Sequence, residues 1–328
     1  MKLRANSKIS ETTRRQSTRQ VGARLHHYYE TIGLRPEVLP DQTGQDHPLV
    51  HYCTPRERTL IKWNPRLRLP IYYVDAFAEK LFQGNPAAVV TVTESLDTTT
   101  MQSIAFENNL SETAFVLVAA MPFSIRWFSP LVEVDLCGHA TLASARILFD
   151  DHLPPNSSRV NFSAKRGSLS AFKRDNLIYL DFPAETPTVE KKNKNLAQAL
   201  GAEPVEFYKG QDDFLAVFES EKAIHAIDPD FSLLAKLECR GVIVTAPGDQ
   251  VDFVSRFFAP RTGVPEDPVT GSTHTLMVPY WARKIGGKTE FTAAQLSQRS
   301  GRLYCELSGS RVFIGGHTKK YLQGEISI

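Results

Sequence analysis

Three titratable residues, Glu112, His139 and Asp267, are candidates for proton transfer. Glu112 follows Ser111 and leads directly into the apolar run 114–118. Apolar surroundings raise the pKa of a carboxyl group, so a glutamate at this place could act as a general base near neutral pH. The spacing alone leaves open that Glu112 is a surface residue at a strand end and that Ser111 is only a local cap.

His139 and Asp267 each have a catalytic and a structural interpretation. His139 precedes an apolar helical segment, so it could exchange protons with a substrate or be a hydrogen-bonded histidine at a helix start. Asp267 lies in a polar loop, where it could act as a second acid or base, orient a substrate, or only cap the next helix. His274, a few residues further on, is expected to pack in the core or to support the site from behind.

Two pentapeptides, residues 126–130 and 256–260, match at a constant offset of 130 residues. Each is followed by a polar loop that contains glycine and then by an apolar helical segment, so we expect two similar halves made by duplication. The loop glycines, Gly138 and Gly271, would let the backbone approach a ligand, and each helix N-terminus would offer free N–H groups to an anion. Two facing halves would bring both N-termini into one cleft, where a small carboxylated molecule is the natural ligand.

The remaining polar groups do not indicate a cofactor site. Cys137 could suggest a two-thiol racemase, but the second loop holds Asp267 and no cysteine. Glu133 and Asp135 alternate with valines, as on the solvated face of a strand, and are not expected to form a metal pair. The four cysteines lack the spacing of a disulfide framework or a structural zinc site, and no nucleotide-binding or G-x-S-x-G motif occurs. We therefore expect no metal, nucleotide or organic cofactor.

The segments that position these residues alternate between strand and helix patterns. A strand rich in β-branched and aromatic residues begins at Ile71, and a helix capped by Asp97 is expected over about 98–109. Further strands are expected over 87–92, 113–118, 123–128 and 132–136, and a buried helix over 140–149. Many strands with single buried helices are typical of an α+β layer architecture rather than of a parallel βαβ sheet.

Charge is distributed unevenly along the 328 residues. Residues 1–70 hold 13 Lys+Arg and 6 Asp+Glu (13 − 6 = +7), and the other 258 residues hold 25 and 30 (25 − 30 = −5). The body is therefore not expected to bind nucleic acid, and its size suits two halves of about 130 residues. The longest apolar run, 114–121, is much shorter than the roughly 20 residues of a membrane span, so no membrane partner is expected.

Residues 1–70 are expected to form a basic extension with little packed structure. They lack the apolar segment of a secretory signal, and we expect a cytoplasmic protein. Residues 1–25 are rich in Arg and Ser and poor in acids, so mitochondrial targeting is a minor alternative, beside a disordered tail or a start assigned too far upstream.

Four motifs in order resemble the PhzF-like family, which is named for the phenazine-biosynthesis isomerase and is related to diaminopimelate epimerase. They lie at residues 75–77 with 84–89, at 109–115, at 126–128 with 134–142, and at 256–260 with 266–272. The likeness covers about residues 71–328. Thr273 stands where the family usually has alanine, a mild departure beside the site.

The resemblance implies an α+β fold of the diaminopimelate-epimerase type with two pseudo-symmetric halves, each a twisted, mostly antiparallel sheet around a central helix. The halves would cover residues 71–188 and 189–328, and strand 317–328 is a candidate to return to the first half. The active site would lie in the cleft between the halves. A homodimer is a further expectation from the family.

The resemblance also implies proton transfer without a cofactor. Glu112 would move a proton between two carbons of the substrate, while His139 and Asp267 would assist reprotonation and hold the substrate. The other contacts would come from Ser111, Gly138, Gly271 and Ser272. The reference substrate of the family is trans-2,3-dihydro-3-hydroxyanthranilate, which carries a carboxylate and an amine.

The sequence leaves three hypotheses for the activity. The first is an isomerase of a small carboxylated, cyclic or unsaturated amine that uses Glu112 as its base. The second is a non-catalytic binding or scaffold protein that keeps the fold, against which the intact Glu112, His139 and Asp267 argue. The third is an amino-acid epimerase of the diaminopimelate type, which the missing second thiol disfavours.

Overall fold

The computed structural model describes residues 67–191 and 193–328, which belong to the compact unit Asn64–Ile328. The targeting interpretation of residues 1–25 and most of the expected basic extension lie outside the described residues. Within the described residues, no helix has the length and apolar character that crossing a bilayer requires.

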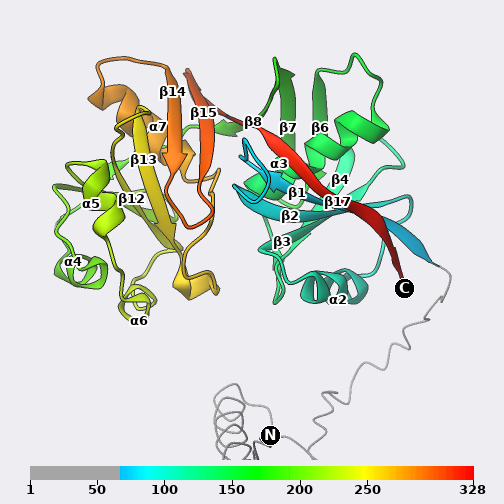
Figure 1. Ribbon diagram of the computed structural model, residues 1–328, viewed down its shortest axis with the longest axis horizontal. Helices are drawn as coiled ribbons and strands as arrows, with labels where there is room; N and C mark the ends of the chain where they lie inside the picture. The colour runs from blue at the N-terminus through cyan, green and yellow to red at the C-terminus, as the bar shows by residue number, and fades with distance from the viewer. Residues whose placement is uncertain (1–66, 192) are drawn as a thin grey trace, which may run out of the picture. The chain divides into compact units, whose positions relative to one another are not determined.

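The first half of the described chain is a sheet with a helix on each face (Figure 1). Its strands pair in the order β1-β2-β3-β4-β6-β7-β8, with β2 parallel to β3, β4 parallel to β6, and the other neighbours antiparallel. The elements are β1 (Arg68–Ala76), β2 (Asn85–Val92), α2 (Thr98–Asn108), β3 (Glu112–Leu117), β4 (Phe123–Phe128), the short β5 (Glu133–Val134), α3 (Gly138–Ile147), the π-helical turn η1 (Leu148–His152), β6 (Arg159–Ala164), β7 (Gly167–Arg174) and β8 (Leu177–Pro183).

The second half repeats this sheet, strand for strand (Figure 1). Its strands pair in the order β10-β11-β12-β13-β14-β15-β16, and the parallel pairs, β11 with β12 and β13 with β14, stand at the same places as in the first half. The elements are α4 (Lys194–Leu200), β10 (Glu206–Lys209), β11 (Asp213–Val217), α5 (Glu221–Ala226), α6 (Phe231–Leu234), β12 (Gly241–Pro247), β13 (Phe253–Phe258), the 3₁₀ turn η2 (Pro260–Thr262), α7 (His274–Lys284), β14 (Glu290–Gln295), β15 (Gly301–Ser308) and β16 (Arg311–Gly316).

Each half gives one strand to the other. After β8, the chain enters the second half with β9 (Thr188–Val189), which pairs with β10. After β16, it returns to the first half with β17 (Thr318–Ser327), which pairs with β1. Strands β8 and β16 also pair with one another, so one continuous sheet runs through both halves. The fold is therefore the α+β arrangement of two pseudo-symmetric halves that the sequence predicts.

The predicted duplication is visible in side chains as well as in strands. Arg126 of β4 donates from Nε to Glu133 Oε1 over 2.7 Å, and Arg256 of β13 donates from Nε to Glu266 Oε1 over 2.8 Å. Each guanidinium also lies over the phenylalanine two residues further along its own strand, at 5.1 Å and 4.9 Å from the ring centre. The two matching pentapeptides thus form the same local structure twice.

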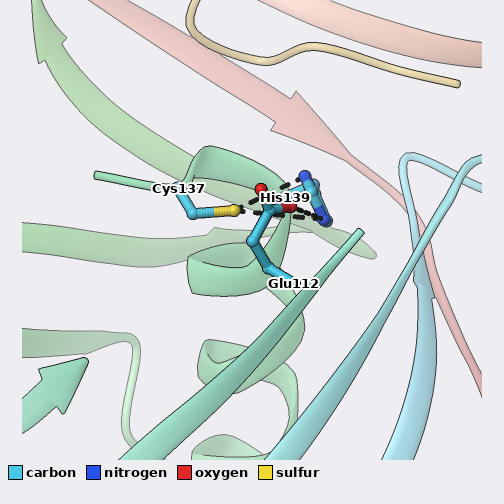
Figure 2. Close-up of side chains that lie close together, drawn as sticks. All are labelled: Glu112, Cys137 and His139. Carbon is cyan, nitrogen blue, oxygen red and sulfur yellow. Dashed lines mark hydrogen bonds and ion pairs between the residues drawn. The ribbon is translucent and has the colours of Figure 1, made fainter. Parts of the chain in front are cut away.

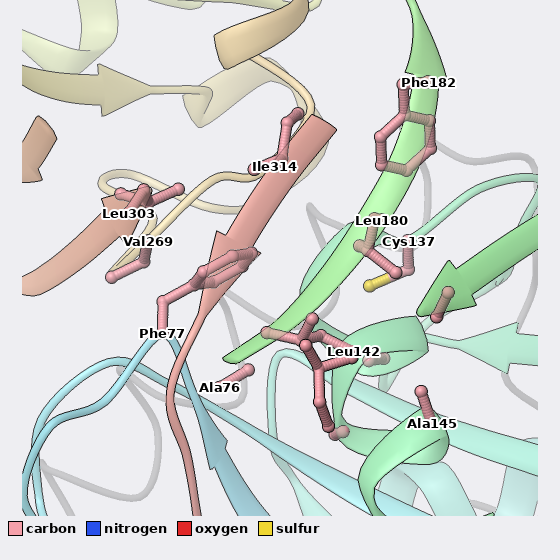
Figure 3. Close-up of a cluster of buried hydrophobic side chains, with 14 of the residues drawn as sticks. Ala76, Phe77, Cys137, Leu142, Ala145, Leu180, Phe182, Val269, Leu303 and Ile314 are labelled. Atoms are coloured by element: carbon pink, nitrogen blue, oxygen red, sulfur yellow. The ribbon is translucent and has the colours of Figure 1, made fainter. Parts of the chain in front are cut away.

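The alternation of side chains along β2 and β3 explains the two helix-covered faces. Ala87 and Val89 of β2 belong to the core cluster around α3, whereas Ala88 and Val90 belong to the cluster with α2. The cluster around α3 continues into the second half, where Phe77 at the end of β1 lies among side chains that include Val269, Leu303 and Ile314 (Figure 3). A shared core therefore supports the region where the halves meet.

Several element boundaries differ from the expected ones. The strand expected over 87–92 begins at Asn85, and the helix expected over 140–149 begins at Gly138 and ends at Ile147. Strand β1 begins at Arg68 and not at Ile71, because residues 68–70 pair with residues 325–327 of β17. The expected strand over 132–136 is reduced to Glu133–Val134, since only these two residues pair with β4 and Asp135 is held by Lys165 and Arg166 instead. Residues 68–70 therefore belong to β1.

The early start of β1 leads to a test with two shortened proteins. We expect a protein that begins at Leu67 to melt at the temperature of the full chain, and one that begins at Ile71 to melt about 4–8 °C lower. The second protein lacks Leu69, which is 5% exposed, and the first pairings of β1 with β17. Calorimetry would measure both values. Equal melting temperatures would contradict a structural role for residues 68–70.

Candidate active site

A cleft of about 460 Å³ lies where the two halves meet, and both halves form its wall. The first half contributes the start of β3 and the start of α3, and the second half contributes the loop that leads into α7. Every residue that the sequence suggested for proton transfer or substrate binding lines this cleft: Ser111, Glu112, Gly138, His139, Asp267, Gly271 and Ser272.

The N-termini of α3 and α7 approach one another at the cleft. A Cβ atom on Gly138 would make an ordinary contact at 3.8 Å from Gly271 Cα, whereas one on Gly271 would lie only 3.2 Å from Phe77 Cζ. Neither of the two helix starts has a side-chain cap, at Cys137 for α3 or at Thr273 for α7. The N–H groups of residues 274–276 donate to the carbonyl groups of residues 271–273, so the N–H groups available to an anion are those at the start of α3 and those of residues 271–273 just before α7.

Glu112 is the first residue of β3, and its carboxyl group contacts both His139 and Cys137 (Figure 2). His139 Nε2 lies 3.2 Å from Glu112 Oε2, and the Cys137 thiol hydrogen-bonds to the same carboxyl group. Desolvation, with the negative charge of Asp267 as a second cause, raises the pKa of Glu112 to about 8. The group is therefore able both to accept and to donate a proton near neutral pH.

His139 is buried and is held in one tautomer. Desolvation lowers the pKa of His139 to about 3, so its ring is neutral. Asn85 Nδ2 lies 3.2 Å from His139 Nδ1. Because an amide nitrogen only donates, we assign Nδ1 as the acceptor and place the ring proton on Nε2. The contact with Glu112 is then an N–H···O hydrogen bond from a neutral imidazole and not an ion pair.

Asn85 links the two halves at this point. Its amide nitrogen also donates to Asp267 Oδ1 over 2.8 Å and to the Val269 carbonyl over 3.0 Å. The nitrogen has two hydrogens for three acceptors, so one hydrogen is shared between two of them, and the three acceptors together set the orientation of the amide group. Asn85 is fully buried at the start of β2, so its contacts relate His139 of the first half to Asp267 of the second.

Asp267 lies on the second-half side of the cleft, and its side chain caps no helix. The carboxylate accepts hydrogen bonds from Asn85 and from Thr270 Oγ1, while the N-cap position of α7 is Thr273. Desolvation raises the pKa of Asp267 to about 6, against the hydrogen bonds and the positive charge of Arg240. The cap interpretation therefore does not apply, and the carboxylate is left to face the cleft.

Two side chains that line the cleft, Cys137 and Arg240, and one buried behind it, Asn85, were not among the residues selected from the sequence. Asn85 directly precedes an apolar strand. Cys137 was set aside, yet its buried thiol contacts Glu112, and burial raises its pKa far above the usual range. Arg240 precedes β12 as Ser111 precedes β3, so a closer comparison of the two halves would have found it.

The other residues considered from the sequence have structural partners. Glu133 and Asp135 line the cleft, where Glu133 pairs with Arg126 and Asp135 lies 2.8 Å from Lys165 Nζ. His274 is fully buried, with its Nδ1 3.0 Å from the Thr270 carbonyl. This agrees with the expected packing role of His274.

Glu112, Cys137 and His139 also have donor types that a zinc ion accepts, and their donor atoms lie within 4.8 Å of one another. No other such group occurs among residues 67–191 and 193–328. Burial raises the pKa of both Cys137 and Glu112, so metal binding would first require the loss of two protons. The raised pKa values of Glu112 and Cys137 therefore favour the protonated groups over a metal-bound state.

Comparison with known proteins gives a consistent picture. A family model described as phenazine biosynthesis-like protein (PhzC-PhzF) matches residues 74–324. A protein of Pseudomonas aeruginosa named as an uncharacterized isomerase is 48% identical over 262 residues, which cover 80% of this chain and all of the relative. The crystal structure of a PhzF-family phenazine biosynthesis protein from Enterococcus faecalis is 44% identical, with a TM-score of 0.77, and covers 80% of this chain and 100% of that one.

The fold extends beyond close relatives. The crystal structure of a hydroxyproline epimerase from Agrobacterium vitis superposes with a TM-score of 0.54 at 10% identity, covering 81% of this chain and 94% of the epimerase. At this identity the likeness concerns the fold alone. It places the two-half architecture among the epimerase-like folds, as the sequence predicts.

The raised pKa of Glu112 predicts how stability depends on pH. The folded-state pKa of about 8 exceeds the ordinary value of 4.5, so the folded protein holds a proton that the unfolded chain releases, and stability falls as pH rises between these values. Glu112→Gln should remove this slope, on the order of 1.4 kcal/mol per pH unit. Chemical denaturation from pH 5 to 9 would measure it.

Asp267→Asn serves as the control for this pH series, because the folded-state pKa of Asp267 is about 6. Asp267→Asn should change the pH dependence of the free energy of unfolding only between the ordinary carboxyl pKa and about pH 6. The prediction would be wrong if the free energy of unfolding had the same pH dependence in the wild type and in Glu112→Gln from pH 6 to 8. Glu112 would then be ionised in the folded protein throughout this range.

The tautomer of His139 gives a second, spectroscopic prediction. The ¹⁵N resonances of His139 should report an Nε2–H ring in the wild type and a mixture of tautomers in Asn85→Ala, which lacks the amide donor. Asn108→Ala is the control, because Asn108 lies in the same half and donates to Thr113 Oγ1 instead. An unchanged Nε2–H signal in Asn85→Ala would mean that another group selects the tautomer.

Proposed function

The chain belongs to the phenazine biosynthesis-like (PhzF) family, and on that premise we propose that it is an isomerase that moves a proton between two carbons of a small carboxylated substrate. The substrate class is like trans-2,3-dihydro-3-hydroxyanthranilate, bound in the cleft between the halves. The observation that carries the proposal is the Glu112 carboxyl group, which is mostly buried at the cleft, contacts His139, and has a pKa of about 8 that suits proton transfer near neutral pH.

In the proposed reaction, Glu112 takes a proton from one carbon of the substrate and returns the same proton to another carbon. The electron pair of the broken C–H bond shifts along the substrate, so a double bond migrates and no other reactant is needed. The Nε2–H of His139 and the Cys137 thiol donate to the Glu112 carboxylate, and they stabilise it before it gains the proton. No step requires a cofactor.

His139 and Asp267 complete the proposed site. The neutral His139 ring can release its Nε2 hydrogen bond to Glu112 and donate it to the substrate as charge develops there. Asp267, held by Asn85 and Thr270, can accept a hydrogen bond from a substrate amine. The N–H groups near Gly138 and Gly271 and the hydroxyl groups of Ser111 and Ser272 would hold the remaining polar atoms.

The two other hypotheses have weaker support in the cleft. A scaffold protein has no use for a desolvated carboxyl group, whose burial costs stability at neutral pH. A two-thiol epimerase needs a second cysteine on the opposite wall, but the residue before Gly271, which corresponds to Cys137 before Gly138, is Thr270.

Proton exchange in heavy water tests the proposal. Full-length protein incubated with trans-2,3-dihydro-3-hydroxyanthranilate should catalyse deuterium uptake and double-bond migration, both followed by NMR. Glu112→Gln should lower the rate about 10²–10⁴-fold, which is the usual contribution of a general base. Asp135→Asn is the matched control, because Asp135 also lines the cleft but pairs with Lys165 and Arg166.

The possible results separate the hypotheses. Exchange that requires Glu112 and persists in a chelator supports isomerase chemistry without a metal. Exchange that a chelator abolishes and zinc restores would contradict the cofactor-free part. Loss of activity in Cys137→Ser but not in Glu112→Gln would favour the epimerase hypothesis, and binding without any exchange would favour another carboxylated substrate or a binding protein.

A further inference from the structure

A half-buried ion pair in the second half, Arg240 with Asp213, has no counterpart in the first. Arg240 donates to both carboxylate oxygens of Asp213, with Nε 2.9 Å from Oδ1, and it lines the cleft beside Ser272. We infer that Arg240, held by Asp213, is the receptor for an anionic group of the substrate, so the substrate must carry a carboxylate at the end that faces the second half. This inference rests on the proposed use of the cleft for a small metabolite.

The register of the strands shows that the ion pair is not required by the fold. In the first half, Ala87 of β2 lies opposite Glu112 of β3. In the second half, Asp213 of β11 lies opposite Gly241 of β12. Asp213 therefore occupies the place of Ala87, and Arg240 occupies that of Ser111. Strands β2 and β3 pair with Ala87 and Ser111 at these positions, and β11 and β12 pair in the same way with Asp213 and Arg240. The strand pairing therefore does not depend on the charged residues.

The same comparison shows that the second half cannot carry a base where the first half does. Gly241 occupies the place of Glu112, and a Cβ atom there would lie 2.4 Å from Cζ of Phe257. The Arg240 guanidinium lies over that same ring, at 5.5 Å from its centre. The second half thus lacks the carboxyl group of the first and presents a cation at this end of the cleft.

The burial of the pair also argues for a role beyond stability. The Asp213 side chain is 7% exposed, whereas that of Arg240 is 38% exposed. Burying such a pair costs desolvation energy that its mutual attraction often only offsets, and apolar residues frequently serve folding equally well. A pair with its carboxylate buried and its guanidinium open to the cleft is expected where the cation must be held in place for a ligand.

The hydrogen bonds of Arg240 leave donors for that ligand. Two go to Asp213, and Nη1 donates to Ser272 Oγ over 3.3 Å, so within the described residues three of the five guanidinium N–H groups have partners. Residues 271–273, which precede α7, lie beside them, and their N–H groups have no partner within the described residues. The cleft wall also carries Arg166 and the acidic residues Glu133, Asp135 and Asp212. Glu133 and Asp135 are held in ion pairs with Arg126, Lys165 and Arg166. A carboxylate near Ser272 would therefore meet both a fixed cation and free N–H groups.

A pair of matched ligands tests the inference without relying on turnover. Calorimetry would compare 3-hydroxyanthranilate with its primary amide, 2-amino-3-hydroxybenzamide, which has the same shape and no negative charge. The full-length wild type should bind the acid more tightly than the amide by about tenfold or more. The double variant Asp213→Ala/Arg240→Ser carries the residue pair that the first half already accommodates, so it should fold.

In this double variant, the affinity for the acid should fall about 10–100-fold and that for the amide should not change. Arg240→Lys should be intermediate, because it keeps the charge and loses the two-point bond to Asp213. Arg166→Gln removes a charge from the same cleft wall, and it should keep the preference for the acid.

Three results would overturn the inference: equal binding of acid and amide by the wild type, a preference that survives in the double variant, or an equal loss in Arg166→Gln. Failure of the acid to bind the wild type at millimolar concentration would also overturn it. Because these measurements involve no exchange, they separate the inference from the proposed reaction. If exchange needs Glu112 but the acid and the amide bind equally, the proposed isomerase reaction is supported and the inferred role of Arg240 is wrong.

Discussion

The meeting of two helix N-termini at Gly138 and Gly271 is the constraint on which the rest of the site depends. The exchange of β9 and β17 and the pairing of β8 with β16 make one sheet of both halves, so this meeting is built into the fold. Helices and strands begin around it, and residues at or just before their first positions, such as Ser111, Glu112, His139, Arg240 and Ser272, bring polar side chains to the cleft. Glu112 opens β3, and Arg240 immediately precedes β12. The cleft therefore collects polar groups without interrupting either core.

The two halves have nearly the same fold, so the positions at which their side chains differ indicate which residues serve the chemistry of the cleft. The ion pairs of Arg126 in β4 with Glu133 and of Arg256 in β13 with Glu266 are almost identical in the two halves, so they are part of the shared fold. Glu112 occupies the position that Gly241 occupies in the second half, and Asp213 occupies the position that Ala87 occupies in the first half. One half thus holds the proton-transfer group and the other holds the charged pair. A duplicated fold can keep its packing while each copy takes a different task.

The sequence predicted the parts of the site that local patterns encode. The offset of 130 residues indicated the duplication, and the glycine loops before apolar helices indicated the cleft and its lining residues. The contacts of Asn85 could not be predicted, because its three acceptors come from segments up to 184 residues away. The pairing of Arg240 with Asp213 likewise depends on the register of β11 and β12. Long-range register, rather than residue type, was the missing information.

The electrostatics of the cleft explain why its one receptor cation is paired. A group that takes a proton and gives it back works best with a pKa near the operating pH, which Glu112 reaches through desolvation. An unpaired arginine in the same cleft would favour the ionised carboxylate, lower that pKa and weaken the base. Asp213 offsets part of the positive charge of Arg240, which still lowers the pKa of Asp267, and it leaves N–H donors free. The second half can then offer hydrogen bonds to a carboxylate, while desolvation and Asp267 remain the main influences on the pKa of Glu112.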